Sequence, residues 1–136
     1  MAKGYKELVA DAEAVIETWT VERALAEYGK PGVTFVDLRD VRELQREGRI
    51  PGALHAPRGM LEFWIDRDSP YHREQFASGD RFVFFCAAGW RSALATRTAL
   101  EMGLEPVCHI AGGFGAWREA GGAVAPLPER SPPKQG

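Results

Sequence analysis

The sequence predicts an α/β domain built on a largely parallel sheet. Short apolar, strand-like runs alternate along its 136 residues with helix-like segments, an order typical of parallel sheets covered by helices. One run, RFVFFC at 81–86, is apolar almost throughout, as in a strand buried on both faces. The length fits a single domain. In such domains ligands bind at the carboxyl ends of the strands, where the next helix begins.

The first third of the chain is expected to hold two helices and a strand. Residues 5–19 repeat apolar side chains roughly along one helical face. Thr20 is suited to cap a second helix, which Gly29 ends. The run VTFVDL at 33–38 then predicts a buried strand.

The middle of the chain begins with a helix start signal. Asp40 and Glu43 have the spacing of a capping box and predict a short helix that ends at Gly48. The turn IPG at 50–52 leads into a short strand, ALHA, at 53–56.

The rest of the chain alternates between irregular and regular segments. The expected elements are a short helix around 60–65, a loop at Ser69 and Pro70, the strand at 81–86, a helix over 91–102, a strand at 107–110 and a glycine-framed helix within 111–122. We therefore divide the chain into an N-terminal helical extension (1–17), the α/β domain (18–125) and a flexible, proline-rich tail (126–136).

Composition limits the partners and the compartment. A net charge of −2 gives no reason to expect nucleic acid or an anionic membrane as partner. No apolar run approaches the roughly 20 residues that span a bilayer, and acidic residues occupy the N-terminus where a signal peptide would be apolar. We therefore expect a cytoplasmic protein. Nothing in the sequence predicts its oligomeric state.

The cysteines and histidines do not form a metal-binding pattern. The two cysteines, Cys86 and Cys108, lack C-x-x-C spacing, and the three histidines do not fall at zinc spacing with them. Cys108 and His109 are adjacent, and neighbours on a strand point to opposite faces. We expect no structural disulfide, no metal and no cofactor, and we interpret Cys108 as a buried structural thiol.

The segment after the strand at 81–86 is the candidate active-site loop. Cys86 is followed in order by Ala87, Ala88, Gly89, Trp90, Arg91 and Ser92. The thiolate is the reactive form of cysteine, and the N-terminus of a helix attracts negative charge. Small side chains let backbone amides converge on an anion, an arginine adds a cation suited to oxyanions, and a serine can cap the helix or donate to the sulfur. Together they predict a nucleophile in an anion cradle.

A plainer interpretation competes with this one. A cysteine at a strand end is often a small buried hydrophobe, and Gly89 and Arg91 suit an ordinary turn and a solvated first helical turn. The order of all these residue types favours the functional loop. Asp37 and Arg39 end a strand at the same edge, so they either line the site or form a structural brace. Trp90 is expected at the pocket mouth, at a partner surface or in packing. The remaining large aromatics are expected to pack in the core or at its rim: Phe63, Trp64, Phe114 and Trp117.

The loop CAAGWRS resembles the active-site loop of the rhodanese-like sulfurtransferase family, in which Cys is followed by four residues and then Arg or Thr. Three other stretches match the family in the same order: FVDLRD (35–40), GRIPGALHAP (48–57) and HIAGGFGAWREAGG (109–122). The resemblance runs from about Thr18 to Val124. It implies a rhodanese-like fold of five parallel strands flanked by helices on both faces, and it favours the brace for Asp37 and Arg39.

The resemblance also implies a single-domain rhodanese of the thiosulfate sulfurtransferase type, with no cofactor. Cys86 would take a sulfane sulfur from thiosulfate or a persulfide donor and hold it as a persulfide. A thiophilic acceptor, such as cyanide, a small thiol or a protein thiol, would then remove it. Residues 87–92 would bind the donor. Two positions depart from the family: Ala87 stands where many members have Arg, which weakens the expectation of strong thiosulfate binding, and Arg49 replaces a frequent His at a structural turn.

Two other functions remain open from the sequence. A persulfide- or redox-sensing or partner-binding module would use the same activated thiol without significant turnover. A cysteine phosphatase or arsenate reductase would share the architecture but would carry five residues between Cys and Arg, where this chain has four.

Overall fold

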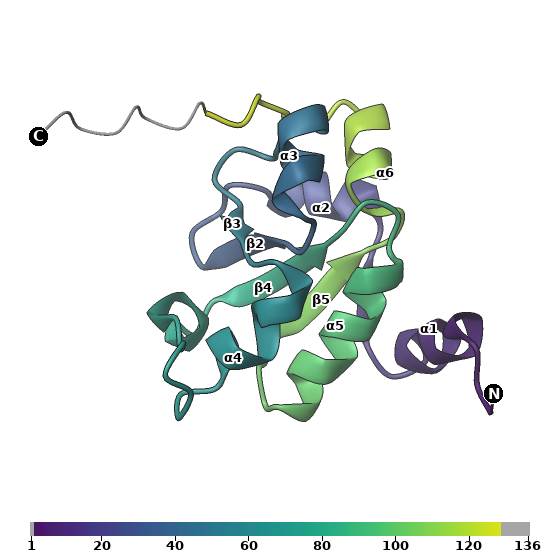
Figure 1. The fold of residues 1–136 in the computed structure, drawn as a ribbon. Coiled ribbons are helices and arrows are strands. Elements are labelled where there is room, and N and C mark those ends of the chain that lie inside the picture. The colour runs from purple at the N-terminus through teal and green to yellow at the C-terminus, as the bar shows by residue number, and fades with distance from the viewer. Residues whose placement is uncertain (1, 129–136) are drawn as a thin grey trace, which may run out of the picture.

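The computed structural model of the chain, which describes residues 2–128, contains a five-stranded sheet in which every strand is parallel to its neighbours (Figure 1). The strands lie in the order β1-β5-β4-β2-β3. Their bounds are β1 Glu17–Trp19, β2 Val33–Asp37, β3 Leu54–His55, β4 Arg81–Phe85 and β5 Val107–Ile110. The predicted fold class is confirmed.

Helices cover both faces of the sheet (Figure 1). Their bounds are α1 Tyr5–Glu13, α2 Val21–Glu27, α3 Val41–Glu47, η1 Arg58–Met60, α4 Leu61–Ile65, η2 Glu74–Ala77, α5 Trp90–Glu101 and α6 Gly113–Glu119, where η1 and η2 are 3₁₀ turns. The central strand β4 shows how the core is divided. Phe82 and Phe84 pack with α4 and α5 on one face, whereas Val83 and Phe85 pack with α2 and α6 on the other, because successive side chains of a strand alternate.

Local sequence signals account for most of these boundaries. The Thr20 hydroxyl accepts a hydrogen bond of 3.2 Å from the backbone N–H of Arg23 at the start of α2. The capping box of Asp40 and Glu43 is complete at the start of α3. The predicted turn at Arg49 forms an isolated antiparallel bridge with Ala125. The 3₁₀ turn η2 was not expected from the sequence.

The helix predicted over residues 5–19 is wrong at its C-terminal end. Helix α1 stops at Glu13, and residues 17–19 form strand β1, which pairs with β5 through Thr18 opposite His109. Thr and Trp favour strands, and pairing at this sheet edge leaves Trp19 only 1% exposed. Burial of this tryptophan and the strand hydrogen bonds therefore outweigh the helical pattern.

The N-terminal helix lies at the margin of this fold. Helix α1 packs outside the sheet against α5, where Val9 and Ala12 form a small cluster with Ala93. The division into an extension, a domain and a tail stays a prediction, and residues 129–136 of the predicted tail lie outside the described residues. Within residues 2–128, no helix has the length and apolarity needed to cross a membrane.

Candidate active site

The cysteine loop lies where β4 ends and α5 begins. Cys86 follows Phe85, the last residue of β4, and its side chain is 1% exposed. Gly89 precedes α5 with φ of 106°, in the left-handed region. A residue with a side chain is strained in this conformation, so a glycine lets the chain turn sharply from strand to helix. The turn places the sulfur beside the N-terminus of a helix of 12 residues.

Backbone N–H groups point at the sulfur. The N–H groups of Gly89 and Ser92 donate to Sγ of Cys86 at 3.2 and 3.4 Å, and Oγ of Ser92 lies 3.5 Å from the same sulfur. Donors arranged in this way stabilise a thiolate. Ala88 is exposed and Ala87 half-buried, so these two residues present only small side chains to solvent.

Helix α6 holds the loop from the side opposite α5. The N–H of Phe114 donates to the carbonyl of Cys86 at 2.8 Å, and the N–H of Gly115 donates to that of Ala87 at 3.1 Å. A Cβ at Gly113 would collide with the carbonyl oxygen of Cys86 and would lie 2.9 Å from that of Ala87. The glycine therefore allows α6 to approach the loop backbone. The glycines of the stretch HIAGGFGAWREAGG (109–122) are consistent with such a close approach, but the sequence does not show which segment they contact.

Arg91 is paired with a residue of α3 rather than free over the loop. Its guanidinium makes two hydrogen bonds of 2.8 Å to the carboxylate of Glu43. The bonds from Arg91 lower the pKa of Glu43 from 4.5 to about 2, against the opposing effect of burial. The same pair raises the pKa of Arg91, and the nearby Cys86 sulfur adds to this in the same direction. Glu43 also accepts from the N–H of Asp40 in the capping box. The pair ties the start of α3 to the start of α5.

Ser92 continues from the sulfur into the protein interior. Its Oγ lies 2.9 Å from Nδ1 of His109, which comes from β5. Burial lowers the pKa of His109 to about 4, so the imidazole is neutral at pH 7. His109 is not among the site residues predicted from the sequence. The sequence does indicate which face of the sheet His109 occupies, because Cys108 and His109 are neighbours on a strand and must point to opposite faces.

Asp37 and Arg39 form a buried pair at the end of β2. The Arg39 guanidinium bonds to the Asp37 carboxylate at 2.8 Å and to the carbonyl of Gly48 at 2.9 Å, and it lies 3.9 Å from the ring of Phe114. Glu47 approaches it at 3.6 Å. These contacts join β2, α3 and α6, which is the arrangement of a brace around the site.

The other selected side chains divide between surface and core. Trp90 is 58% exposed and its ring lies 5.1 Å from that of Tyr5 in α1. Cys108 is fully buried among apolar residues, and burial raises the pKa of its thiol to about 12, which confirms the prediction of a buried thiol. The aromatics differ: Phe114 and Trp117 are core residues, Trp64 is partly buried and Phe63 is exposed.

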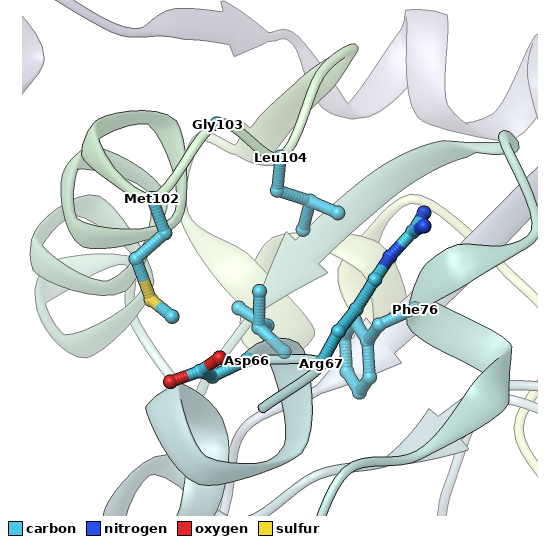
Figure 2. Close-up of a pocket in the computed structure, with 7 residues that line it drawn as sticks. Asp66, Arg67, Phe76, Met102, Gly103 and Leu104 are labelled. Carbon is cyan, nitrogen blue, oxygen red and sulfur yellow. The ribbon is translucent and has the colours of Figure 1, made fainter. Parts of the chain in front are cut away.

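Two cavities lie at opposite ends of α5. One, of about 190 Å³, is lined by Ala88, Gly89 and Trp90 of the loop together with His109 and neighbouring residues. The other, of about 390 Å³, is lined by Asp66, Arg67 and other residues at the C-terminal end of the helix (Figure 2). A helix of this length separates them by about 18 Å. Of the two, only the first is lined by residues of the cysteine loop, so the second is outside the candidate site.

The fold and the loop together define a class, namely α/β proteins that hold a cysteine in an amide cradle at the carboxyl edge of a parallel sheet. The model of the rhodanese-like domain matches residues 20–120. The chain belongs to the rhodanese-like domain family.

Individual proteins of known sequence or structure are also similar to the chain. A mouse protein named thiosulfate sulfurtransferase/rhodanese-like domain-containing protein 3 is 31% identical over 90 residues, which cover 62% of this chain and 57% of that protein. This chain thus aligns with little more than half of its relative. A solved structure from Rhodopseudomonas palustris, of a protein of unknown function described as a possible tyrosine phosphatase, has a TM-score of 0.90 and 51% identity, covering 92% of this chain and 96% of that one. A thiosulfate sulfurtransferase from Pseudomonas aeruginosa has a TM-score of 0.73 at 22% identity, covering 93% and 23%, which shows the fold alone.

Proposed function

We propose that the protein is a sulfurtransferase that carries a sulfane sulfur on Cys86. The observation that carries the proposal is the sulfur itself, which accepts hydrogen bonds from the N–H groups of Gly89 and Ser92 at 3.2 and 3.4 Å. Such donors stabilise the thiolate that attacks and the persulfide anion that results. Membership of the rhodanese-like family supports the same chemistry.

The reaction proceeds in two half-reactions at one sulfur atom. The Cys86 thiolate attacks the outer sulfur of thiosulfate, and the S–S bond of the donor breaks, with its electron pair leaving on sulfite. Cys86 then holds that sulfur as a persulfide anion. A thiophile such as cyanide attacks the outer sulfur and leaves as thiocyanate, and the electron pair of the persulfide bond returns to Cys86 as the thiolate. A persulfide donor and a thiol acceptor follow the same steps.

The pairing of Arg91 with Glu43 supports a smaller role for Arg91 in donor binding than the sequence suggests. Its guanidinium is held by Glu43 at 2.8 Å in two bonds, so the carboxylate offsets part of the charge that Arg91 offers to the sulfur of Cys86. The backbone amides at the start of α5 are therefore the main anion-binding groups of the loop. Ala87 adds no cation to them. We infer that the loop binds a persulfide donor at least as well as thiosulfate, because binding of a persulfide depends less on a cation in the loop.

A phosphatase is the second candidate, because the solved Rhodopseudomonas palustris relative is described as a possible tyrosine phosphatase. Loop size argues against it. Four residues separate Cys86 from Arg91, and the amides of Gly89 and Ser92 already converge on one sulfur atom. A phosphate needs room for its oxygens beside the attacking thiolate. A redox-sensing module would keep the activated thiol but would turn over slowly.

The proposal extends to partners and compartment. The sulfur acceptor is a small thiol or an exposed thiol of another protein, and neither a nucleic acid nor a membrane is required. Both cysteines are free thiols, which suits the cytoplasmic location predicted from the sequence.

Steady-state kinetics test the proposal against both alternatives. Initial rates are measured over a grid of thiosulfate and cyanide concentrations, with a small aryl phosphate as a separate substrate. We expect parallel double-reciprocal lines, the pattern of a ping-pong reaction, and no phosphate release. Arsenate reduction is assayed with the same preparation. Phosphate release that depends on Cys86 would show that the protein is a phosphatase rather than a sulfurtransferase. A Cys86 that can be alkylated but gives no turnover on any donor would favour the sensing module.

A further inference from the structure

A buried chain of three side chains begins at the nucleophile. Sγ of Cys86 lies 3.5 Å from Oγ of Ser92, which lies 2.9 Å from Nδ1 of His109. The three residues are 1%, 0% and 3% exposed. His109 lies on β5 opposite Phe84 of β4 and faces α5, because its neighbour Cys108 packs on the other face of the sheet.

The hydrogen-bond partners identify which nitrogen of His109 carries the proton. Nε2 is buried and has no partner among the described residues. A neutral imidazole has one N–H group, and an orphaned buried N–H is rarer than an acceptor without a partner. The proton therefore belongs on Nδ1, where it is donated to Oγ of Ser92. The hydroxyl of Ser92 then has its own proton free to donate to the sulfur of Cys86.

We propose that His109 is a positioning residue that fixes the Ser92 hydroxyl as a third hydrogen-bond donor to the Cys86 sulfur. The fixed hydroxyl stabilises the thiolate before sulfur transfer, and the persulfide anion after it if the proposed function holds. The proton of the thiol leaves to solvent, and no bond to His109 is made or broken. The neutral imidazole suits this task, because its charge does not change near pH 7.

Fixed charges around the three side chains of Cys86, Ser92 and His109 also act on the sulfur. These charges stay the same when His109 is replaced. Glu13 of α1 lines the cavity beside His109. Arg91 of α5, which Glu43 of α3 pairs, lies close enough to Cys86 to interact with its sulfur. The pair Asp37 and Arg39 lies at the end of β2, the strand next to β4. Each arginine is paired with a carboxylate. A change seen on replacing His109 can therefore be assigned to the hydroxyl.

Alkylation of Cys86 tests the proposal without any sulfur donor. The rate of iodoacetamide modification of the Cys86 peptide is followed by mass spectrometry against pH. In His109→Leu we expect the midpoint of this profile to rise by about one pH unit, the effect of one lost hydrogen bond to a charged group. His109→Asn should restore most of the shift, because an asparagine amide can donate from nearly the same position. His72→Gln, far from the loop, is the control and should match the wild type.

A double mutant separates action through Ser92 from general disturbance. Because His109 is inferred to act only through Ser92, the variant Ser92→Ala/His109→Leu should have the same midpoint as Ser92→Ala alone. Additive shifts, or a wild-type midpoint in folded His109→Leu, would overturn the proposal. ¹⁵N NMR of the wild type gives a test that needs no variant: a proton on Nε2 rather than Nδ1 above the Cys86 midpoint also overturns it. Since alkylation requires no turnover, these results do not depend on whether the protein transfers sulfur.

Discussion

Replacing Glu43 by glutamine should destabilise the protein measurably, because Glu43 joins α3 to the cysteine loop. Its carboxylate accepts two bonds of 2.8 Å from Arg91 and one from the N–H of Asp40. The pKa of Glu43 falls from 4.5 to about 2, and a shift of that size corresponds to at most about 3 kcal/mol. The Arg91 side chain is 40% exposed, so solvent screening reduces the effect, and glutamine keeps the bond to Asp40. We expect Glu43→Gln to cost about 1–2 kcal/mol at pH 7.

The stabilisation from Glu43 depends on pH, and the direction of its pKa shift determines how. The folded-state pKa of Glu43 is depressed, so its stabilisation is fully present above the unfolded value of 4.5 and is lost as pH falls toward about 2. The difference in unfolding free energy between wild type and Glu43→Gln should therefore be largest at pH 7 and clearly smaller at pH 3.

Urea unfolding at these two pH values measures both effects. Glu62→Gln is the matched control, because Glu62 pairs with Arg58 on the surface of η1 and α4 at 2.8 Å in an i,i+4 arrangement. Such pairs contribute about 0.2–0.5 kcal/mol. If Glu43→Gln loses no more stability than Glu62→Gln at pH 7, or if its deficit is unchanged at pH 3, the pair does not brace the loop.

Three further predictions concern the loop and its two thiols. Cys86→Ser should abolish sulfur transfer. Cys108→Ser should keep nearly full turnover, but it should lose about 1–3 kcal/mol of stability because it places a hydroxyl in the core. Equal loss of turnover in both folded variants would mean that the nucleophile is misassigned. Inserting one glycine between Ala88 and Gly89 should sharply reduce sulfur transfer and allow weak phosphate binding, and unchanged kinetics would show that loop length is not decisive. Ala87→Arg should lower the thiosulfate KM, by at most about 1.5–3 kcal/mol of binding free energy, and an unchanged KM would refute the role of the missing cation.

Features that depend on a short stretch of chain could be predicted from the sequence. The apolar run of β4, the cysteine after it, the small residues with Gly89 and the helix α5 follow one another within about twenty residues, so their order alone defines the loop. The capping box of Asp40 and Glu43 is equally local. In each case a small number of consecutive residues determines the conformation.

Features that depend on pairing between distant segments could not be predicted from the sequence. Strand β1 has three residues, and its conformation comes from pairing with β5 near the other end of the chain. Glu43 lies 48 positions before Arg91, and His109 lies 17 positions after Ser92. Charge and periodicity do not show which of many carboxylates or histidines meets a given loop. The side of the sheet that His109 occupies was nevertheless available from its neighbour Cys108.

Sulfur bound covalently to Cys86 is the most direct sign of the proposed function. Reduced protein is incubated with thiosulfate, freed of excess donor and analysed by intact and peptide mass spectrometry before and after cyanide is added. We expect the gain of one sulfur atom on the Cys86 peptide, its complete removal by cyanide and no gain in Cys86→Ser. A folded wild-type protein whose Cys86 is alkylatable but gains no sulfur from thiosulfate or from a persulfide donor, or which carries the sulfur on Cys108 instead, would contradict the assignment.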